Sequence, residues 1–283
     1  MHSGEFYHGN NGDHPRKNDE GILSVALGAG GPFAIAYDSG ICVGLGQKGI
    51  DVRKASGFIG TSGGAWVEGF IVTEMTDEEV ESIPKISFPN RKHGYLQKIG
   101  RDVFDDARSP LVQTATVRLP SRRHLLPSVE ILSGDKHDLA DIIPASSAIP
   151  IGYRPVRVND ERYVDGGVRS FTHANRAVGA QNLLVVAALA KHFRLSVGPL
   201  RNLSVGRTLE TMANHEMNQW EKQHRGQAHL IRPNRAIGGL VERFSDLFDK
   251  KIARRAYDMA IEQSHQLVEN RQDLATLALR MSD

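Results

Sequence analysis

The stretch "GFIGTSGGAW" (residues 57–66) places a serine, Ser62, among glycines, with apolar residues before it and a helix-compatible run after it. A strand that turns sharply into a helix leaves no room for side chains beside the residue at the turn, and glycine meets that need in the GxSxG pattern of a nucleophile elbow. We therefore interpret Ser62 as a candidate nucleophile, and Gly60, Gly63 and Gly64 as the elbow glycines.

A second glycine-rich turn, "LGAGGPFA" (residues 27–34), follows an apolar run at 22–27. The chain thus begins as strand, glycine turn, helix, strand, glycine turn and helix, which predicts an α/β fold with a mainly parallel central sheet. Ligands bind such sheets at the carboxyl ends of the strands, where both turns lie. The apolar stripe of the first helix consists of Ala34, Ile35, Ile41, Cys42 and Leu45.

The rest of the chain carries weaker signals. "YRPVRVNDERYVDGG" (residues 153–167) predicts a β-hairpin that turns at Asn159 and Asp160 and ends at Asp165. Residues 73–140 contain several prolines and charged runs, and we interpret them as helices and loops that cover the sheet as a lid. We expect a disordered tail over residues 1–20, one domain over 21–283, buried strands at 181–189 and 228–233, and a C-terminal helix over 249–280.

Composition narrows the class of function. The 283 residues are 40% hydrophobic and 24% charged, as in an ordinary globular protein, and a net charge of +2 does not favour nucleic acid as a partner. The single cysteine, Cys42, and the absence of a signal-peptide pattern or a long apolar segment predict a cytoplasmic protein. The 12 histidines lack metal-ligand spacing, so we expect no metal and no cofactor.

Two chemistries fit the first glycine turn. Its N–H groups at a helix N-terminus suit the pyrophosphate of a dinucleotide, but Phe33 occupies the third position of GxGxxG, which requires Gly or Ala. The turn also suits an oxyanion hole, which requires a nucleophile nearby, and Ser62 supplies one.

A serine hydroxyl needs a base. Asp165, at a strand end before two glycines, is the candidate for direct proton transfer, and His173 is the best histidine for a Ser-His-Asp triad. Asp38 falls within the apolar arc of its helix, where it either approaches the site or complements the helix dipole; we favour the second.

These motifs together resemble the patatin-like phospholipase family. The resemblance rests on the first glycine turn, GTSGG, and "ASSAIP" followed by "YVDGG", and it extends from Ile22 to Leu189. It implies a three-layer α/β/α fold and a Ser-Asp dyad of Ser62 and Asp165. The family's oxyanion-hole glycines correspond to Gly30 and Gly31, and the turn departs from the family pattern at Ala29, Phe33 and Ala34.

The resemblance implies a serine acyl hydrolase that cleaves ester bonds of lipids. Two alternatives stay open: a catalytically silent protein that binds lipid or a partner, and a Ser-His-Asp esterase of another hydrolase fold. The basic and apolar stretch "VRLPSRRHLL" (residues 117–126) is interpreted first as a solvated loop, with peripheral contact to anionic lipid head groups as the alternative.

Overall fold

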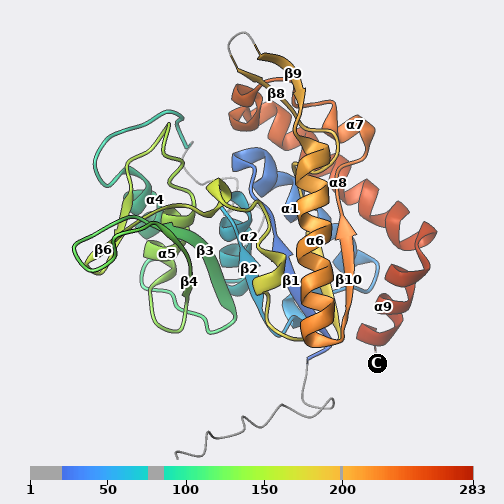
Figure 1. Ribbon diagram of the computed structural model, residues 1–283. Helices are drawn as coiled ribbons and strands as arrows, with labels where there is room; N and C mark the ends of the chain where they lie inside the picture. The colour runs from blue at the N-terminus through green and yellow to red at the C-terminus, as the bar shows by residue number, and fades with distance from the viewer. Residues whose placement is uncertain (1–20, 76–85, 198–199, 283) are drawn as a thin grey trace, which may run out of the picture.

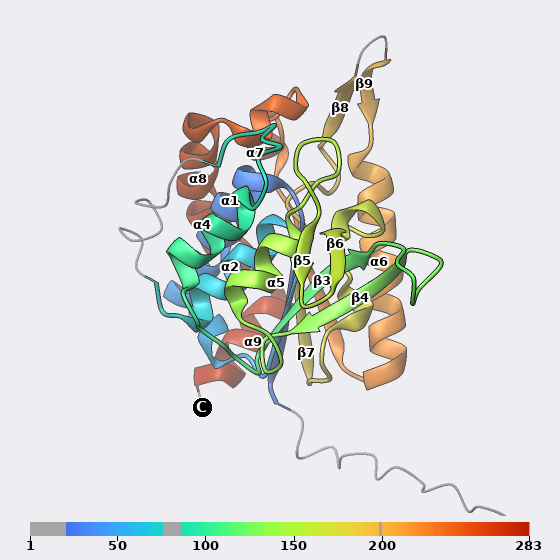
Figure 2. The same cartoon turned by 90° about the vertical axis from the view of Figure 1, so that its left-hand side faces the viewer.

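The computed structural model describes residues 21–75, 86–197 and 200–282 (Figures 1 and 2). The predicted disordered tail, and residues 76–85 of the predicted cover, lie outside the described residues.

In the described part of the chain, eight strands form one sheet in the order β10-β7-β1-β2-β3-β6-β5, and β4 pairs with β3. The strands from β10 to β3 run parallel, whereas β4, β5 and β6 are joined by antiparallel pairing. The predicted mainly parallel central sheet is confirmed. The strands are β1 Leu23–Leu27, β2 Phe58–Gly60, β3 Val112–Arg118, β4 Ser128–Ser133, β5 Val156–Val158, β6 Glu161–Asp165, β7 Asn182–Val186 and β10 Gln227–Ile231, with β8 Arg194–Val197 and β9 Leu200–Ser204 forming a separate hairpin.

Helices flank the sheet on both faces, so the predicted three-layer arrangement is confirmed (Figures 1 and 2). Helix α6 covers one face, and α1, α2, α4, α5 and α8 lie on the other. The helices are α1 Gly31–Gln47, α2 Gly63–Val72, α4 Tyr95–Phe104, α5 Leu139–Ser146, α6 Gly206–His224, α7 Arg235–Gly238, α8 Lys250–Asn270 and α9 Gln272–Ser282.

Strand β1 illustrates how the sequence separates the two faces of the sheet. Successive side chains of a strand point to opposite faces. Leu23, Val25 and Leu27 therefore join the core beneath α1 and α8, whereas Ala26 joins the core beneath α6, where Trp220 is fully buried. Because both faces are covered, the strand reads as a continuous apolar run.

The strand register brings the sequence motifs to one edge of the sheet. Leu27 at the end of β1 pairs with Gly60 at the end of β2, and Gly60 pairs with Thr114 of β3. Further along β3, Thr116 pairs with Asp165. The two glycine turns and the candidate base therefore follow neighbouring positions of the same sheet.

Three later predictions from the sequence are also confirmed. The hairpin turns at Asn159 and Asp160, between the paired residues Val158 and Glu161. Strands β7 and β10 form within the ranges expected to be strands, apart from Gln227, which precedes the second range by one residue.

The interpretation of residues 73–140 as helices and loops was wrong in one respect, because β3 and β4 lie there and β3 is internal to the sheet. Strand β3 contains polar residues, so it lacks the apolar run from which the other buried strands were predicted. Thr114 donates a hydrogen bond to Glu68 Oε1 (2.8 Å), and Thr116 donates to the carbonyl of Glu130 (2.7 Å). Hydroxyls that are satisfied in this way can be buried, so no apolar run is required.

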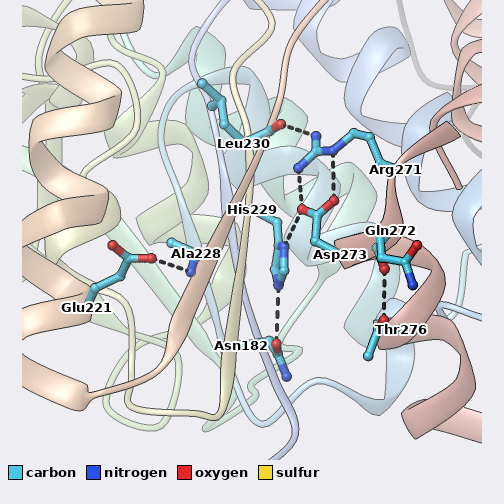
Figure 3. Close-up of polar contacts among 9 residues, drawn as sticks. All are labelled: Asn182, Glu221, Ala228, His229, Leu230, Arg271, Gln272, Asp273 and Thr276. Atoms are coloured by element: carbon cyan, nitrogen blue, oxygen red, sulfur yellow. Dashed lines mark hydrogen bonds and ion pairs between the residues drawn. The ribbon is translucent and has the colours of Figure 1, made fainter.

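The C-terminal helix expected over residues 249–280 is two helices, α8 and α9, with Arg271 extended between them. Figure 3 shows why the chain breaks there. The Arg271 guanidinium donates to the carbonyl of Leu230 (2.7 Å) and, through Nη2, to Asp273 Oδ2 (2.6 Å). Asp273 Oδ2 also lies 2.8 Å from Nδ1 of the buried His229, and His229 Nε2 lies 3.2 Å from Asn182 Oδ1. This network fastens the start of α9 to β10 and β7.

Replacing Asp273 by alanine is expected to lower the free energy of unfolding by about 2 kcal/mol at neutral pH, because His229 and Arg271 both lose a charged acceptor. Urea unfolding followed by circular dichroism measures this. Asp258→Ala is the matched control, since its ion pair with Arg254 is exposed (59% for the Asp258 side chain), and its loss should stay below about 0.5 kcal/mol.

The loss should also depend on pH. Partial burial opposes ionisation of Asp273, but the hydrogen bonds from Arg271 and His229 outweigh it and hold the pKa well below its usual range. A lowered folded-state pKa stabilises the protein above the unfolded value of about 4, and this contribution disappears as the pH falls through the folded value. An equal difference between wild type and Asp273→Ala at neutral and strongly acidic pH would contradict this account.

Candidate functional site

Ser62 occupies the turn between β2 and α2 in a conformation that non-glycine residues rarely adopt, with φ 53° and ψ −114°. Its side chain is buried, and α2 begins at the next residue. Strain of this kind persists only where the surroundings hold the backbone in place, and it clusters at functional sites. The predicted strand-to-helix elbow is therefore present at Ser62.

Two serines at the C-terminal end of α5, its last residue Ser146 and the next residue Ser147, hold the Ser62 backbone. The Ser62 N–H donates to Ser146 Oγ (2.8 Å), and Ser147 Oγ lies 3.3 Å from the Ser62 carbonyl as a donor. Ser146 in turn donates to the carbonyl of Ala115 (2.6 Å), and Trp66 Nε1 donates to Ser147 Oγ (2.9 Å). Sequence analysis assigned no role to either serine, although "ASSAIP" was among the quoted motifs. This motif is the sequence signal from which a role for the two serines could have been predicted.

The elbow glycines lie directly against the first glycine turn. A Cβ added to Gly64 would stand 2.2 Å from the carbonyl oxygen of Leu27, and one added to Gly63 would stand 2.6 Å from that of Gly31. The Gly64 N–H donates to the carbonyl of Gly28 (3.0 Å). The third glycine, Gly60, leaves room for α2, because its Cβ would meet the backbone of the helix.

The first turn leads into α1, whose first residue is Gly31 with φ 59°. The N–H groups of Gly30 and Gly31 donate to no acceptor among the described residues, as is usual for the first amides of a helix. Of the departures from the family pattern, Phe33 and Ala34 are core residues, and the Ala29 N–H donates to the carbonyl of Phe171 (2.8 Å). The turn thus presents unpaired donors beside the elbow.

Asp165 ends β6 and lies next to the Ser62 side chain. Burial raises the pKa of its carboxyl to about 7, and donation toward it by the Ser62 hydroxyl and the Gly167 N–H offsets only part of the rise. The Gly167 N–H lies 2.7 Å from Asp165 Oδ1, a regular hydrogen bond. Of the two donors, the Ser62 hydroxyl lowers the pKa of Asp165 more than the Gly167 N–H does.

His173 lies close to the elbow but contacts Thr61 instead of Ser62. Its Nδ1 is 3.2 Å from Thr61 Oγ1, and its Nε2 is buried with no hydrogen-bond partner among the described residues. Burial lowers the pKa of His173, an effect that Arg176 reinforces and Glu216 opposes. The imidazole is therefore neutral at neutral pH, and the contacts of the described chain do not link it to Asp165.

Asp38 does not fill the role that we favoured from the sequence. It is fully buried in the middle of α1, and its carboxyl oxygens have no hydrogen-bond partner among the described residues. Burial raises its pKa well above the usual range, and the nearby Gly28 amide offsets only a part. Asp38 also lies beyond the first turn of α1, where the helix dipole no longer acts on a side chain. Glu68, which the sequence did not single out, is a buried residue of α2, and burial raises its pKa well above the usual range.

A groove with a volume of about 1250 Å³ lies beside the site, between α1, α2 and the first turns of α8. Most of its lining is apolar. Pro32 and Trp66 border it next to the turn and the elbow, and the ring of Phe248 lies between the groove and Gly31. Ser62 and Asp165 are not among the described residues that line it. The groove is therefore a neighbour of the site and not the site itself.

The described segments contain neither a cluster of metal-ligating side chains nor a helix that could cross a membrane. No cluster of three or more His, Cys, Asp or Glu side chains within residues 21–75, 86–197 and 200–282 has the arrangement of a metal site. Within the same segments, no helix combines the length and the apolar character that crossing a bilayer requires.

Comparison with known proteins gives one family match and one similar solved structure. Residues 87–178 match the family model described as "Patatin-like phospholipase", so the resemblance seen in the motifs is confirmed over a segment that contains Asp165 but not Ser62. This match supports hydrolysis of lipid acyl esters as the general activity. The crystal structure of VipD from Legionella pneumophila is similar to 87% of this chain and 67% of its own, with 11% identity and a TM-score of 0.34. No curated protein matches the sequence.

The contact between the two glycine turns predicts how a methyl group added at Gly64 changes the stability of the protein. Gly64→Ala would force Cβ into the carbonyl of Leu27 and should lower the free energy of unfolding by at least about 3 kcal/mol. Gly46→Ala, in the last turn of α1 with nothing within 4 Å of the added Cβ, is the matched control and should stabilise by about 0.5 kcal/mol. Thermal unfolding compares them, and a Gly64→Ala protein as stable as wild type would refute the packing argument.

Proposed function

We propose that the protein is a serine acyl hydrolase that cleaves carboxylic ester bonds of lipids, with Ser62 as nucleophile and Asp165 as its base. The observation that carries this proposal is the position of the Ser62 hydroxyl beside a buried carboxyl whose pKa is raised to about 7. A carboxylate of ordinary pKa is a weak base, whereas one with a pKa near 7 is matched to proton transfer at neutral pH.

In the first half-reaction, Asp165 takes the proton of Ser62 Oγ while this oxygen attacks the ester carbonyl carbon. The carbonyl π electrons move to the oxygen, and the unpaired N–H groups of Gly30 and Gly31 hold the resulting negative charge. When the tetrahedral intermediate collapses, the bond to the leaving alcohol breaks and Asp165 returns the proton to the alcohol oxygen.

In the second half-reaction, water replaces the alcohol. Asp165 takes a proton from the water, whose oxygen attacks the acyl-serine carbonyl, and the same amides hold the second oxyanion. Collapse releases the carboxylic acid and returns the proton to Ser62 Oγ. Atoms and charge balance in both half-reactions.

The lipid character of the substrate is supported by the groove beside the elbow. A mostly apolar lining next to Pro32 and Trp66 offers acyl chains a surface that excludes water. A series of p-nitrophenyl esters with lengthening acyl chains tests this class: kcat/KM should increase with chain length, and a preference for acetyl esters would count against lipids.

The dyad is tested by comparing Ser62→Ala, Asp165→Asn and His173→Asn on the same esters. We expect at least about a thousandfold loss of kcat in the first two variants, because each removes a group that acts in the transition state. His173→Asn should cost about tenfold or less, since His173 acts only on Thr61.

Two outcomes would reject the dyad. A loss in His173→Asn as large as that in Ser62→Ala would favour a Ser-His-Asp esterase. A wild-type protein that hydrolyses no ester and is not labelled at Ser62 by a fluorophosphonate would favour a silent lipid-binding protein.

The pH dependence follows from Asp165. Only the ionised carboxylate accepts a proton, so kcat/KM should fall about tenfold per pH unit below about 7 and level off above it. A profile that is flat between pH 5 and pH 8, measured at about 0.1 M salt, would contradict the proposed base.

Stability gives an independent check on the same group. A raised folded-state pKa means that ionising Asp165 destabilises the fold, with a cost that grows as the pH rises from the unfolded value of about 4 towards about 7. Asp165→Asn removes this cost and keeps an acceptor for the Gly167 N–H. Its Tm should therefore exceed that of wild type at neutral pH and approach it under acidic conditions.

A further inference from the structure

The hairpin tip between β3 and β4, residues 119–127, presents two adjacent leucines to solvent. Leu125 is 84% exposed and Leu126 is 77% exposed. Single exposed apolar residues are common on protein surfaces, but neighbouring large ones at a projecting tip indicate a contact site.

The exposure of these leucines does not come from a loosely attached loop. The N–H of Ser121 donates to the carbonyl of His124 (2.7 Å), which closes the turn. The N–H of Leu119 donates to the carbonyl of Arg162 (2.8 Å), and the Arg162 guanidinium donates back to the carbonyl of Pro120 (3.3 Å). The β3 end of the tip is thus tied to β6 through Leu119 and Pro120.

Four exposed arginines lie on the tip and on the β5–β6 hairpin, whose strand β6 pairs with β3. Arg122 and Arg123 are exposed on the tip, and the exposed Arg157 and Arg162 stand directly opposite each other on β5 and β6. None of the four has an ion pair with another described residue. Like charges at directly opposed positions of a sheet destabilise it, so this pair is expected to have an anionic partner.

The nearby acids do not neutralise this charge. Glu130 is paired with Arg118 (3.1 Å), and Glu161 faces Ser121 and His124. Asp160, at the turn of the β5–β6 hairpin, is the remaining exposed acid on these two hairpins. The surface keeps an excess of positive charge.

We propose that this surface, formed by Leu125, Leu126, Arg122 and Arg123 with Arg157 and Arg162 beside them, binds a bilayer that contains anionic phospholipid. In such a bilayer the leucines enter the acyl-chain region and the arginines bind the lipid phosphates, so both the apolar and the basic side chains of the surface are accounted for. A nucleic acid would satisfy the arginines but leave the leucines in water.

The position of the tip connects it with the site. Thr116 of β3 pairs with Asp165, and the tip begins three residues further along the same strand. A bilayer bound there lies next to the strand pair that carries the proposed base. The class of partner rests on the proposed lipid function, whereas the surface itself is defined without it.

The test measures binding of the full chain with Ser62→Ala, which cannot consume the lipid, to sedimenting vesicles of phosphatidylcholine with or without phosphatidylglycerol. The protein should bind the mixed vesicles far more tightly than the neutral ones. Arg122→Ala with Arg123→Ala should weaken binding to mixed vesicles about 30-fold, and Leu125→Ser with Leu126→Ser at least about tenfold.

Leu279→Ser with Arg280→Ala, an exposed leucine-arginine pair on α9, is the matched control and should leave binding unchanged. Equal binding by the tip variants and this control, or no binding to mixed vesicles by the Ser62→Ala protein, overturns the proposal. In the second case, an acidic protein becomes the better candidate.

The same variants, made with Ser62 intact, separate this proposal from the proposed function. Hydrolysis of a water-soluble p-nitrophenyl ester should be unchanged in the tip variants, because the tip does not contact Ser62 or Asp165. If the tip variants lose vesicle binding and the wild type hydrolyses no ester, the proposed ester hydrolysis is rejected and the proposed bilayer-binding surface is kept. All substituted side chains are exposed, so Tm should stay within about 2 °C of wild type.

Discussion

The carbonyl of Leu27 and the backbone of Gly64 lie against each other, and this contact constrains the rest of the site. It joins the end of β1 to the start of α2 and therefore sets the position of Ser62 relative to the unpaired amides of Gly30 and Gly31. No side chain fits between these two turns. The glycines of the two turns are therefore required, because the two backbones approach too closely for a Cβ. The strained φ of Ser62 belongs to the same tight turn.

The environments of four carboxyls shift their pKa values in three ways. Asp273 stays ionised because Arg271 and His229 donate to it, and it serves to attach α9. At Asp38 and Glu68, burial outweighs the donors around the carboxyl and raises the pKa well above its usual range. Asp165 lies between these cases, because its donors offset burial only in part and its pKa is raised to about 7. The balance between burial and the hydrogen bonds and charges around each carboxyl decides the difference.

The glycine turns and the tip belong to separate parts of the sheet. The glycine turns follow the parallel strands β1 and β2, whereas β5 and β6, which are joined by antiparallel pairing, carry Asp165 and two of the exposed arginines. An antiparallel pair can extend beyond the covering helices with one face in water, which a parallel strand buried on both faces cannot do. This explains why the exposed leucines lie at the end of β3.

The sequence alone determined the features that depend on neighbours along the chain: the glycine turns, the apolar strands β1 and β7, the hairpin at Asn159 and Asp160, and the candidate pair Ser62 and Asp165. Tertiary structure decided what depends on distant partners. Ser146 reaches the Ser62 N–H from 84 positions away, Thr114 is buried in β3 with Glu68 accepting its hydrogen bond, and the pKa of Asp38 is raised because the packed core surrounds it. Local patterns record backbone geometry and average burial, whereas hydrogen-bond satisfaction and pKa are set by groups that meet only in the folded chain.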